Sequence, residues 1–397
     1  MKLSSRLNRI KPSATLAITA KAAALRAAGR DVIGFGAGEP DFDTPENIRK
    51  AAIEAIEAGF TRYTPVGGID ELKDAIVDKL KRDNHLSYKR SQIVVSCGAK
   101  HSLYNLAQVL FEEGDEVIIP GPYWVSYPDI VVLADATPVI VQTEEKNGFK
   151  LTAELIERAV GMRTKALILN SPSNPTGAAY SLDELKSLAE VLVKKDVLVI
   201  SDDIYEKILY DGFSFNNIAS ACEAMVPKTI VVNGVSKAYA MTGWRIGYAA
   251  GPEEVIASID KIQSQNTSNP TSISQKAAVA ALQGDQGALS TMVEEFQKRR
   301  NYIVSALNAI NGVSCLRPQG AFYVFPNISG LFGKSTGSTV IKSSADLAAY
   351  LLDEANVAVV SGDSFGDDRY IRLSYANSMQ NIKKGMERIA EAISKLK

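Results

Sequence analysis

The chain has 397 residues, with 44 lysine or arginine and 45 aspartate or glutamate side chains, so its formal net charge is −1. This balance gives no electrostatic basis for binding nucleic acid or an anionic membrane surface. Only two histidines and three cysteines are present, and their spacing matches no zinc or haem site, so we predict no metal. Proton chemistry in this chain would therefore depend mainly on lysine, tyrosine or carboxylate side chains.

The amino-terminal segment 1–10 is polar and has no apolar run of the kind found in signal peptides. No run elsewhere approaches the roughly 18 apolar residues of a membrane helix. Three widely spaced cysteines do not form a disulfide framework. These features predict a cytoplasmic protein.

Short segments rich in valine and isoleucine alternate with amphipathic patterns over about residues 45–285. This alternation predicts an α/β domain with a largely parallel sheet that is buried on both faces. Ser181 and Glu184 form a capping box at the start of one helix. In chain order the predicted elements are helix Tyr63–Lys81, strand Ile93–Ser96, helix Ser102–Phe111, strands Glu116–Ile119, Pro138–Val141 and Ala166–Asn170, helix Ser181–Lys194, and strands Val197–Ser201, Ile230–Asn233 and Ile246–Ala250.

The pattern changes after about residue 290, where strands and helices are segregated. This change predicts a smaller α+β domain over 286–397, to which we assign residues 1–44 as well. Its predicted elements are helix Thr291–Ile310, strands Ala321–Phe325, Val357–Val360 and Tyr370–Ser374, and helix Met379–Leu396.

Four of the predicted strands end in polar or ionisable residues. In open α/β sheets, ligands bind beyond the carboxyl ends of the strands, so these four ends are expected to converge on one site. The segments that follow the strands are Cys97–Lys100, Asn170–Gly177, Ser201–Tyr205 and Asn233–Lys237.

Lys237 and Arg245 stand out, because Lys237 follows an apolar predicted strand by a few residues and Arg245 lies between Trp244 and Ile246. A lysine desolvated at a strand end becomes a nucleophile for carbonyl groups, and a buried guanidinium needs an anionic partner such as a phosphate. Each feature also has a simpler interpretation when taken alone. Lysines are usually solvated, Asp202 fits a helix N-cap or structural ion pair, and Asn174 fits a turn. The glycines at 34, 36 and 38 do not favour a dinucleotide site, because Glu39 stands where a third glycine is required.

Seven motifs in order make the chain resemble a class I aminotransferase of fold type I, which depends on pyridoxal 5′-phosphate (PLP). The resemblance is closest to the aspartate aminotransferase subgroup Ib and runs from Lys11 to Tyr375. It implies a large domain with a seven-stranded, mostly parallel sheet, a smaller α+β domain and a homodimer with shared active sites. The motifs are Ala37–Pro45, Tyr63 with Gly67-Gly68, Pro122–Tyr127, Asn174–Gly177, Ser201–Tyr205, Ser236-Lys237 with Arg245, and Gly320–Tyr323.

The resemblance also implies roles around the cofactor ring. Lys237 would form the Schiff base with the cofactor and then move a proton between substrate and cofactor. Asp202 would pair with the pyridine nitrogen. Asn174 and Tyr205 would bond to the phenolic oxygen of the ring, and Trp124 would stack on its face.

For the cofactor phosphate, the resemblance implies Gly98, Ala99 and Arg245, with Lys100 and Ser236 nearby and Tyr63 reaching across from the other subunit. Many relatives carry a phosphate-binding serine three residues before the Schiff-base lysine. That position is Gly234 in this chain, so either Ser236 or a group of the partner subunit would take the place of the serine.

For the substrate, the resemblance implies that Arg372 binds the α-carboxylate through a bidentate pair, with Gly38, Asn174 and Trp124 nearby. Ser264 stands where animal-type relatives have an arginine for the second carboxylate. Lys100 would take that role here, although phosphate binding or simple solvation is the alternative for this residue.

The implied function is ping-pong transamination of L-aspartate and 2-oxoglutarate to oxaloacetate and L-glutamate. Thr15 and Lys100 resemble the pair associated with members that also convert prephenate to arogenate. One alternative is an aromatic or other broad-specificity PLP aminotransferase. Another is a non-catalytic PLP-binding sensor domain, which the intact Lys237 and the lack of a fused DNA-binding segment disfavour.

Overall fold

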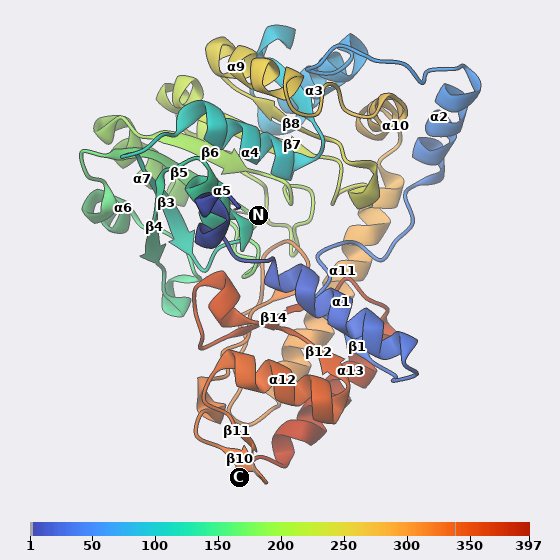
Figure 1. Ribbon diagram of the computed structural model, residues 1–397, viewed down its shortest axis with the longest axis vertical. Helices are drawn as coiled ribbons and strands as arrows, with labels where there is room; N and C mark the ends of the chain where they lie inside the picture. Colours follow the sequence, from blue (N-terminus) through green and yellow to red (C-terminus); the bar gives the residue numbers. More distant parts are fainter. Residues whose placement is uncertain (1–2, 338) are drawn as a thin grey trace.

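The computed structural model describes residues 3–337 and 339–397, and a seven-stranded sheet forms the centre of its upper half in Figure 1. The strand order is β2-β8-β7-β6-β5-β3-β4, and only β8 runs antiparallel to its neighbours. The prediction of a mostly parallel α/β sheet is confirmed. The strands are β2 (Ile93–Ser96), β3 (Glu116–Gly121), β4 (Thr137–Gln142), β5 (Thr164–Asn170), β6 (Leu198–Asp202), β7 (Thr229–Gly234) and β8 (Gly247–Ala250).

Helices cover both faces of this sheet, and successive strand residues point to opposite faces. Val94 packs into a core with α4 (Ala99–Leu110), α5 (Ser126–Leu133) and α9 (Glu253–Ser264). Its neighbours Ile93 and Val95 pack instead with α3 (Asp70–Asn84) and α10 (Ser272–Gln283). Continuous burial of this kind explains why the strands read as unbroken apolar runs. The remaining helices of this half are α2 (Glu46–Glu57), α6 (Ala153–Ala159), α7 (Leu182–Lys195) and α8 (Ile218–Ala221).

A second core lies in the lower half of Figure 1, where the amino-terminal segment meets the carboxyl-terminal third of the chain. Strand β1 (Ile33–Gly34) pairs in parallel with β12 (Val357–Ala358). We keep the division into residues 45–285 and 1–44 with 286–397 as a proposal. The other elements here are α1 (Ala14–Ala27), α11 (Gly287–Asn308), α12 (Ser344–Ala355), α13 (Met379–Ser394), the three-stranded sheet β13 (Val360–Ser361), β14 (Ile371–Ser374) and β9 (Tyr323–Val324), and the hairpin β10 (Ser335–Thr336) with β11 (Thr339–Val340).

Two predicted elements differ from the structure most clearly, and each does so for a local reason. The helix predicted from Tyr63 begins only at Asp70, because Gly68 adopts a φ of +99° that a helix does not contain. The strand predicted over 357–360 divides into β12 and β13, which pair with different partners. The capping box at Ser181 and Glu184 is confirmed.

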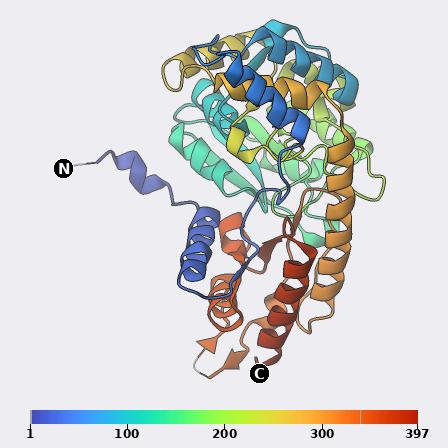
Figure 2. The same ribbon diagram turned by 90° about the vertical axis from the view of Figure 1, so that its right-hand side faces the viewer.

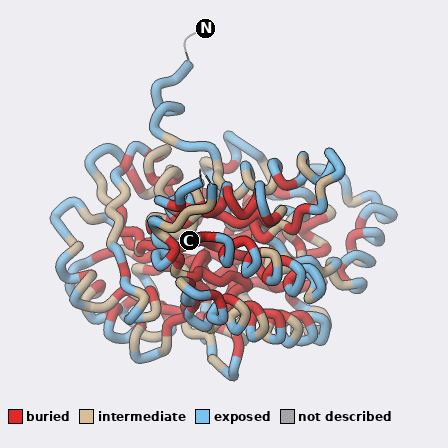
Figure 3. The backbone as a smooth tube through the Cα atoms, turned by 90° about the horizontal axis from the view of Figure 1, so that it is seen from below, coloured by how far each residue is buried: buried red, intermediate tan, exposed pale blue. Residues whose placement is uncertain are grey.

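The segment before α1 extends away from the body of the protein (Figures 2 and 3). It contains a short 3-10 helix, Ser5–Arg9, in which no residue is buried. Over residues 3–337 and 339–397, no helix is both long and apolar enough to cross a membrane.

Candidate functional site

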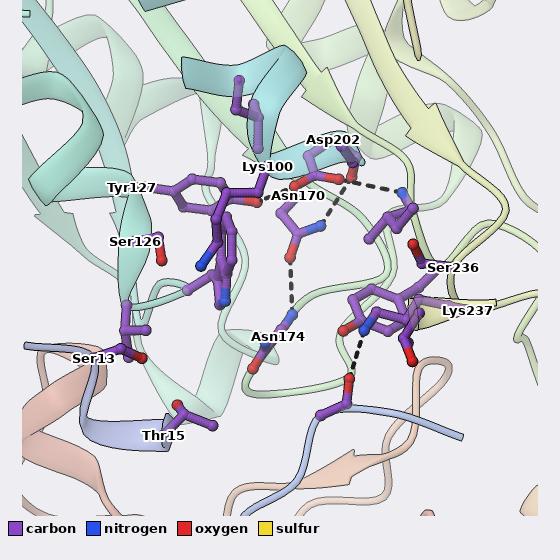
Figure 4. A pocket seen from close by; sticks show the side chains of 18 of the residues that line it. Ser13, Thr15, Lys100, Ser126, Tyr127, Asn170, Asn174, Asp202, Ser236 and Lys237 are labelled. Carbon is purple, nitrogen blue, oxygen red and sulfur yellow. Dashed lines mark hydrogen bonds between the residues drawn. The ribbon is translucent and has the colours of Figure 1, made fainter. Parts of the chain in front are cut away.

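A pocket of about 340 Å³ lies at the carboxyl ends of the parallel strands (Figure 4). In Figure 4, Lys100 and Tyr127 lie on one side of this pocket and Ser236 and Lys237 on the other. The predicted convergence of four strand ends is therefore correct. The predicted site residues that line the pocket are Thr15, Gly38, Ala99, Lys100, Trp124, Asn174, Asp202, Tyr205, Ser236, Lys237, Arg245 and Arg372.

The Lys237 amine lies inside this pocket and donates a hydrogen bond to the carbonyl oxygen of Gly38 at 2.5 Å. Burial lowers the pKa of Lys237 to about 8, with Arg245 and Arg372 adding to this effect and Glu39 and Asp202 opposing it. An amine with such a pKa has a useful neutral fraction near pH 7, which a nucleophile or general base requires.

Asp202 is the last residue of β6, and only 4% of it is exposed. The Tyr127 hydroxyl donates to its Oδ2 at 2.6 Å, and the Ile204 amide donates to its Oδ1 at 3.3 Å. Burial nevertheless raises the pKa of Asp202 to about 6. The carboxylate is thus oriented by two donors in a place that disfavours its charge, so a cation beside it would be stabilised.

Arg372 is buried on β14, and its guanidinium lies over the ring of Tyr323 at 4.6 Å. Its Nη1 donates to Asn174 Oδ1 at 2.9 Å and its Nη2 donates to the Gly36 carbonyl oxygen at 2.7 Å. The buried Nε has no hydrogen-bond partner among the described residues. A buried guanidinium with an unused donor at a pocket wall is suited to an incoming carboxylate.

The turn between β2 and α4 forms the other polar end of the pocket. Gly98 caps α4 with a φ of +90°, and a Cβ there would collide with the Arg245 guanidinium. Arg245 donates to the Thr242 carbonyl oxygen at 2.7 Å and to the Cys97 carbonyl oxygen at 3.3 Å. This places a guanidinium beside the amino terminus of a helix, a combination that suits a phosphate.

Lys100 follows this turn, and its ammonium lies 4.9 Å from the centre of the Trp124 ring. Burial and the neighbouring Arg245 lower the pKa of Lys100. The pocket thus holds four cationic side chains, Lys100, Lys237, Arg245 and Arg372, against the single carboxylate of Asp202. This donor set fits a phosphorylated aldehyde with a basic ring nitrogen, which PLP is, together with a carboxylate substrate.

Two of the predicted site residues do not line the pocket. Gly98 contributes its backbone to the turn behind it. Tyr63 is not among the lining residues and is 91% exposed. Gly234 is closed to any side chain, because a Cβ there would lie 2.8 Å from the Ile246 carbonyl oxygen.

Three polar pocket residues whose side chains hold predicted site residues, Tyr127, Asn170 and Tyr323, were given no role by sequence reasoning. Tyr323 shares a 2.8 Å hydrogen bond with the Tyr205 hydroxyl. Asn170 accepts from the Asn174 amide and donates to the Asp202 carbonyl oxygen, each at 2.9 Å. Tyr127 and Tyr323 stand in two of the seven motifs, and Asn170 ends a predicted strand, so a signal was available for all three.

Comparisons with known proteins agree with this geometry. The family described as aminotransferase class I and II matches residues 30–389. An aspartate/prephenate aminotransferase of Nitrosomonas europaea is 50% identical over 99% of this chain and 100% of its own length. The solved aspartate aminotransferase of Rhizobium meliloti is 49% identical, covers 100% of both chains and has a TM-score of 0.97. That of Thermus thermophilus with maleate is 42% identical over 99% of this chain and 100% of its own, with a TM-score of 0.92.

Proposed function

The chain belongs to the class I and II aminotransferases, and on this premise we propose that it is an aspartate aminotransferase that uses PLP. It would exchange the amino group between L-aspartate and 2-oxoglutarate, giving oxaloacetate and L-glutamate. The observation that carries the proposal is one pocket in which a lysine of lowered pKa and a buried carboxylate lie among three further cations.

PLP, when bound, supplies an electron sink for the negative charge that develops at the substrate Cα. Asp202 would hold a proton at the ring nitrogen, with Tyr127 and the Ile204 amide fixing its orientation. Lys237 would take the proton from the Cα and return it to the other reacting carbon as general acid and base. Its pKa of about 8 suits both directions of transfer near neutral pH.

Asn174, Tyr205 and Trp124 would hold the ring. The backbone amide of Asn174 donates a hydrogen bond to Asn170, and the Asn174 side chain accepts one from Arg372. The Tyr205 hydroxyl is held by Tyr323. These contacts pre-orient the groups that would meet the ring oxygen, which lowers the entropy cost of binding.

The phosphate would be bound by the Gly98-Ala99 turn, by Arg245 and by Ser236. Tyr63 of one subunit would complete the site of the other subunit in a homodimer. In support, Tyr63 is an aromatic residue almost fully exposed on this chain, and exposed tyrosines are enriched where proteins contact partners.

Arg372 would bind the substrate α-carboxylate and Lys100 the second carboxylate, and Gly38 and Thr15 also line the pocket. The relative named aspartate/prephenate aminotransferase supports prephenate as a further amino acceptor. The solved relative with maleate, a dicarboxylate, supports a site for two carboxylates.

The test is a panel of amino donors and 2-oxo acids that includes prephenate, with Lys237→Ala as the inactive control. Aspartate and 2-oxoglutarate should be the favoured pair, and arogenate should form from prephenate. A preference for aromatic donors over aspartate would support a broad-specificity aminotransferase instead. A protein that binds PLP with no turnover would support the sensor alternative.

A further inference from the structure

The segment that carries Tyr63 is exposed at this tyrosine and buried at its carboxyl-terminal end. It connects α2 to α3, and Gly67, Gly68 and Ile69 at its end are buried. An irregular connection usually moves more than the elements that it joins. This connection is instead fixed by two buried glutamines from elsewhere in the chain.

Gln275 on α10 is fully buried and uses both ends of its amide on this connection. Its Nε2 donates to the Thr64 hydroxyl at 3.0 Å and to the Pro270 carbonyl oxygen at 2.9 Å. Its Oε1 accepts from the Ile69 amide at 2.8 Å. One side chain therefore links the residue next to Tyr63 to the first residue before α3.

Gln263 on α9 forms a second link, between the same connection and β2. Its Nε2 donates to the carbonyl oxygens of Val66 and Val95, both at 2.8 Å. The Val95 amide in turn donates to the Gly67 carbonyl oxygen at 2.9 Å. Strand β2 leads directly into the Gly98 turn of the same subunit.

Burying an amide is unfavourable unless its hydrogen bonds are satisfied, and an apolar residue would fill the same space at lower cost. The contacts of Gln275 are directed at the middle and the end of one connection, Thr64 and Ile69, and a general packing role does not explain this choice. A tyrosine on a connection fixed in this way keeps its orientation before the partner subunit binds, so less conformational entropy is lost when the two subunits come into contact.

We propose that Gln275 is a positioning residue for Tyr63, fixing its hydroxyl for the cofactor phosphate in the partner subunit. The inference rests on the proposed function. Gln275 itself touches neither cofactor nor substrate. The hydrogen bonds of Gln263 tie the Tyr63 connection to β2. The same strand therefore supports the phosphate turn of its own subunit and the connection that would carry Tyr63 to the site of the other subunit.

The test compares the affinity of the apoenzyme for PLP with its affinity for pyridoxal, which lacks the phosphate. Tyr63→Phe should weaken PLP binding by about tenfold or more, since a hydrogen bond to a charged group is lost. Gln275→Met, which keeps the side-chain length, should weaken PLP binding by up to the same factor. Pyridoxal affinity should stay nearly unchanged in both variants.

A double variant separates positioning from independent action. If Gln275 acts through Tyr63, Tyr63→Phe with Gln275→Met should bind PLP no more weakly than Tyr63→Phe alone. Thr64→Val removes only the hydrogen bond between Gln275 and the half-buried Thr64 hydroxyl. If Gln275→Met does not fold, Thr64→Val should show the same selective loss of PLP affinity. Gln286→Met is the control, because Gln286 also makes three side-chain hydrogen bonds but none to this connection.

The inference would be overturned by unchanged PLP affinity in both Gln275→Met and Thr64→Val. Equal losses of affinity for PLP and pyridoxal, or additive losses of PLP affinity in the double variant, would overturn it as well. Unchanged PLP affinity in Tyr63→Phe would overturn it too, together with the shared site. Aspartate turnover by the unsubstituted enzyme is measured in parallel. Absence of that turnover would refute the proposed function, whereas any of the other results with turnover intact would refute the positioning role.

Discussion

Replacing Asp202 by asparagine should stabilise the apoprotein at neutral pH while it removes the aminotransferase activity. Burial raises the pKa of the carboxyl from 3.8 to about 6, a shift of about 2 units. Each unit corresponds to about 1.4 kcal/mol, so the ionised carboxylate costs the folded state about 3 kcal/mol. Asparagine has the shape of the protonated side chain, with one acceptor oxygen for the Ile204 amide and an amide donor that faces the Tyr127 hydroxyl, and it carries no charge.

The sign follows from proton binding. The folded state holds the Asp202 proton more tightly than the unfolded state does, so this group favours folding most below pH 3.8. That contribution is lost as the pH rises through about 6. Lys237, with a pKa of about 8, stays largely protonated in both states across this range and contributes little to the change.

The assay is urea unfolding of both apoproteins at one protein concentration, from about pH 4 to pH 7. Because other groups titrate in both proteins, only the difference between the two is interpreted. The stability advantage of Asp202→Asn should be near zero at the acid end and grow to about 3 kcal/mol at pH 7. A constant difference, or a variant less stable at pH 7, would refute the reasoning, because the carboxylate would then carry no burial penalty.

Three further predictions concern the cations and the turn. Lys100→Ala should raise the KM for aspartate by about tenfold to a hundredfold and leave alanine turnover nearly unchanged, in steady-state assays; an equal loss for both would place Lys100 on the phosphate. Gly98→Ala should weaken PLP binding by about tenfold in a titration, since alanine is strained at a φ of +90° and meets Arg245; unchanged affinity would contradict the tight turn. The rate of PLP capture by the apoenzyme should rise with pH and level off about one unit above the Lys237 pKa of about 8, where the amine is largely neutral. Stopped-flow absorbance measures this rate, and a rate still rising at about pH 10 would argue against the lowered pKa of Lys237.

The central sheet could be predicted from the sequence because its strands are buried on both faces. Residues such as Val94 and Val95 pack into different cores, so neither position tolerates a polar side chain. The convergence of Lys237 and Asp202 followed from the same pattern, since parallel strands end at one edge of a sheet.

Contacts between distant segments could not be predicted from local patterns. No periodicity connects Arg372 with Gly36, and only the resemblance to a family gave Arg372 a role. The late start of α3 depends on the φ of Gly68 and on Gln275, which lies far along the chain. Tyr323 and Asn170 were missed because each acts by holding another residue, Tyr323 through the Tyr205 hydroxyl and Asn170 through the backbone amide of Asn174.

The contacts of Arg372 have a consequence for the stage of biosynthesis at which the proposed substrate site can form. Its two partners, Asn174 and Gly36, lie 198 and 336 positions earlier in the chain. The ribosome therefore releases the whole parallel sheet, with Lys237 and Asp202 at its edge, before the guanidinium exists. Since domains fold as units from the amino terminus during synthesis, a nascent chain would acquire the proposed cofactor-binding groups before the proposed α-carboxylate site. Under the proposed function, recognition of amino acids would then be confined to nearly complete chains.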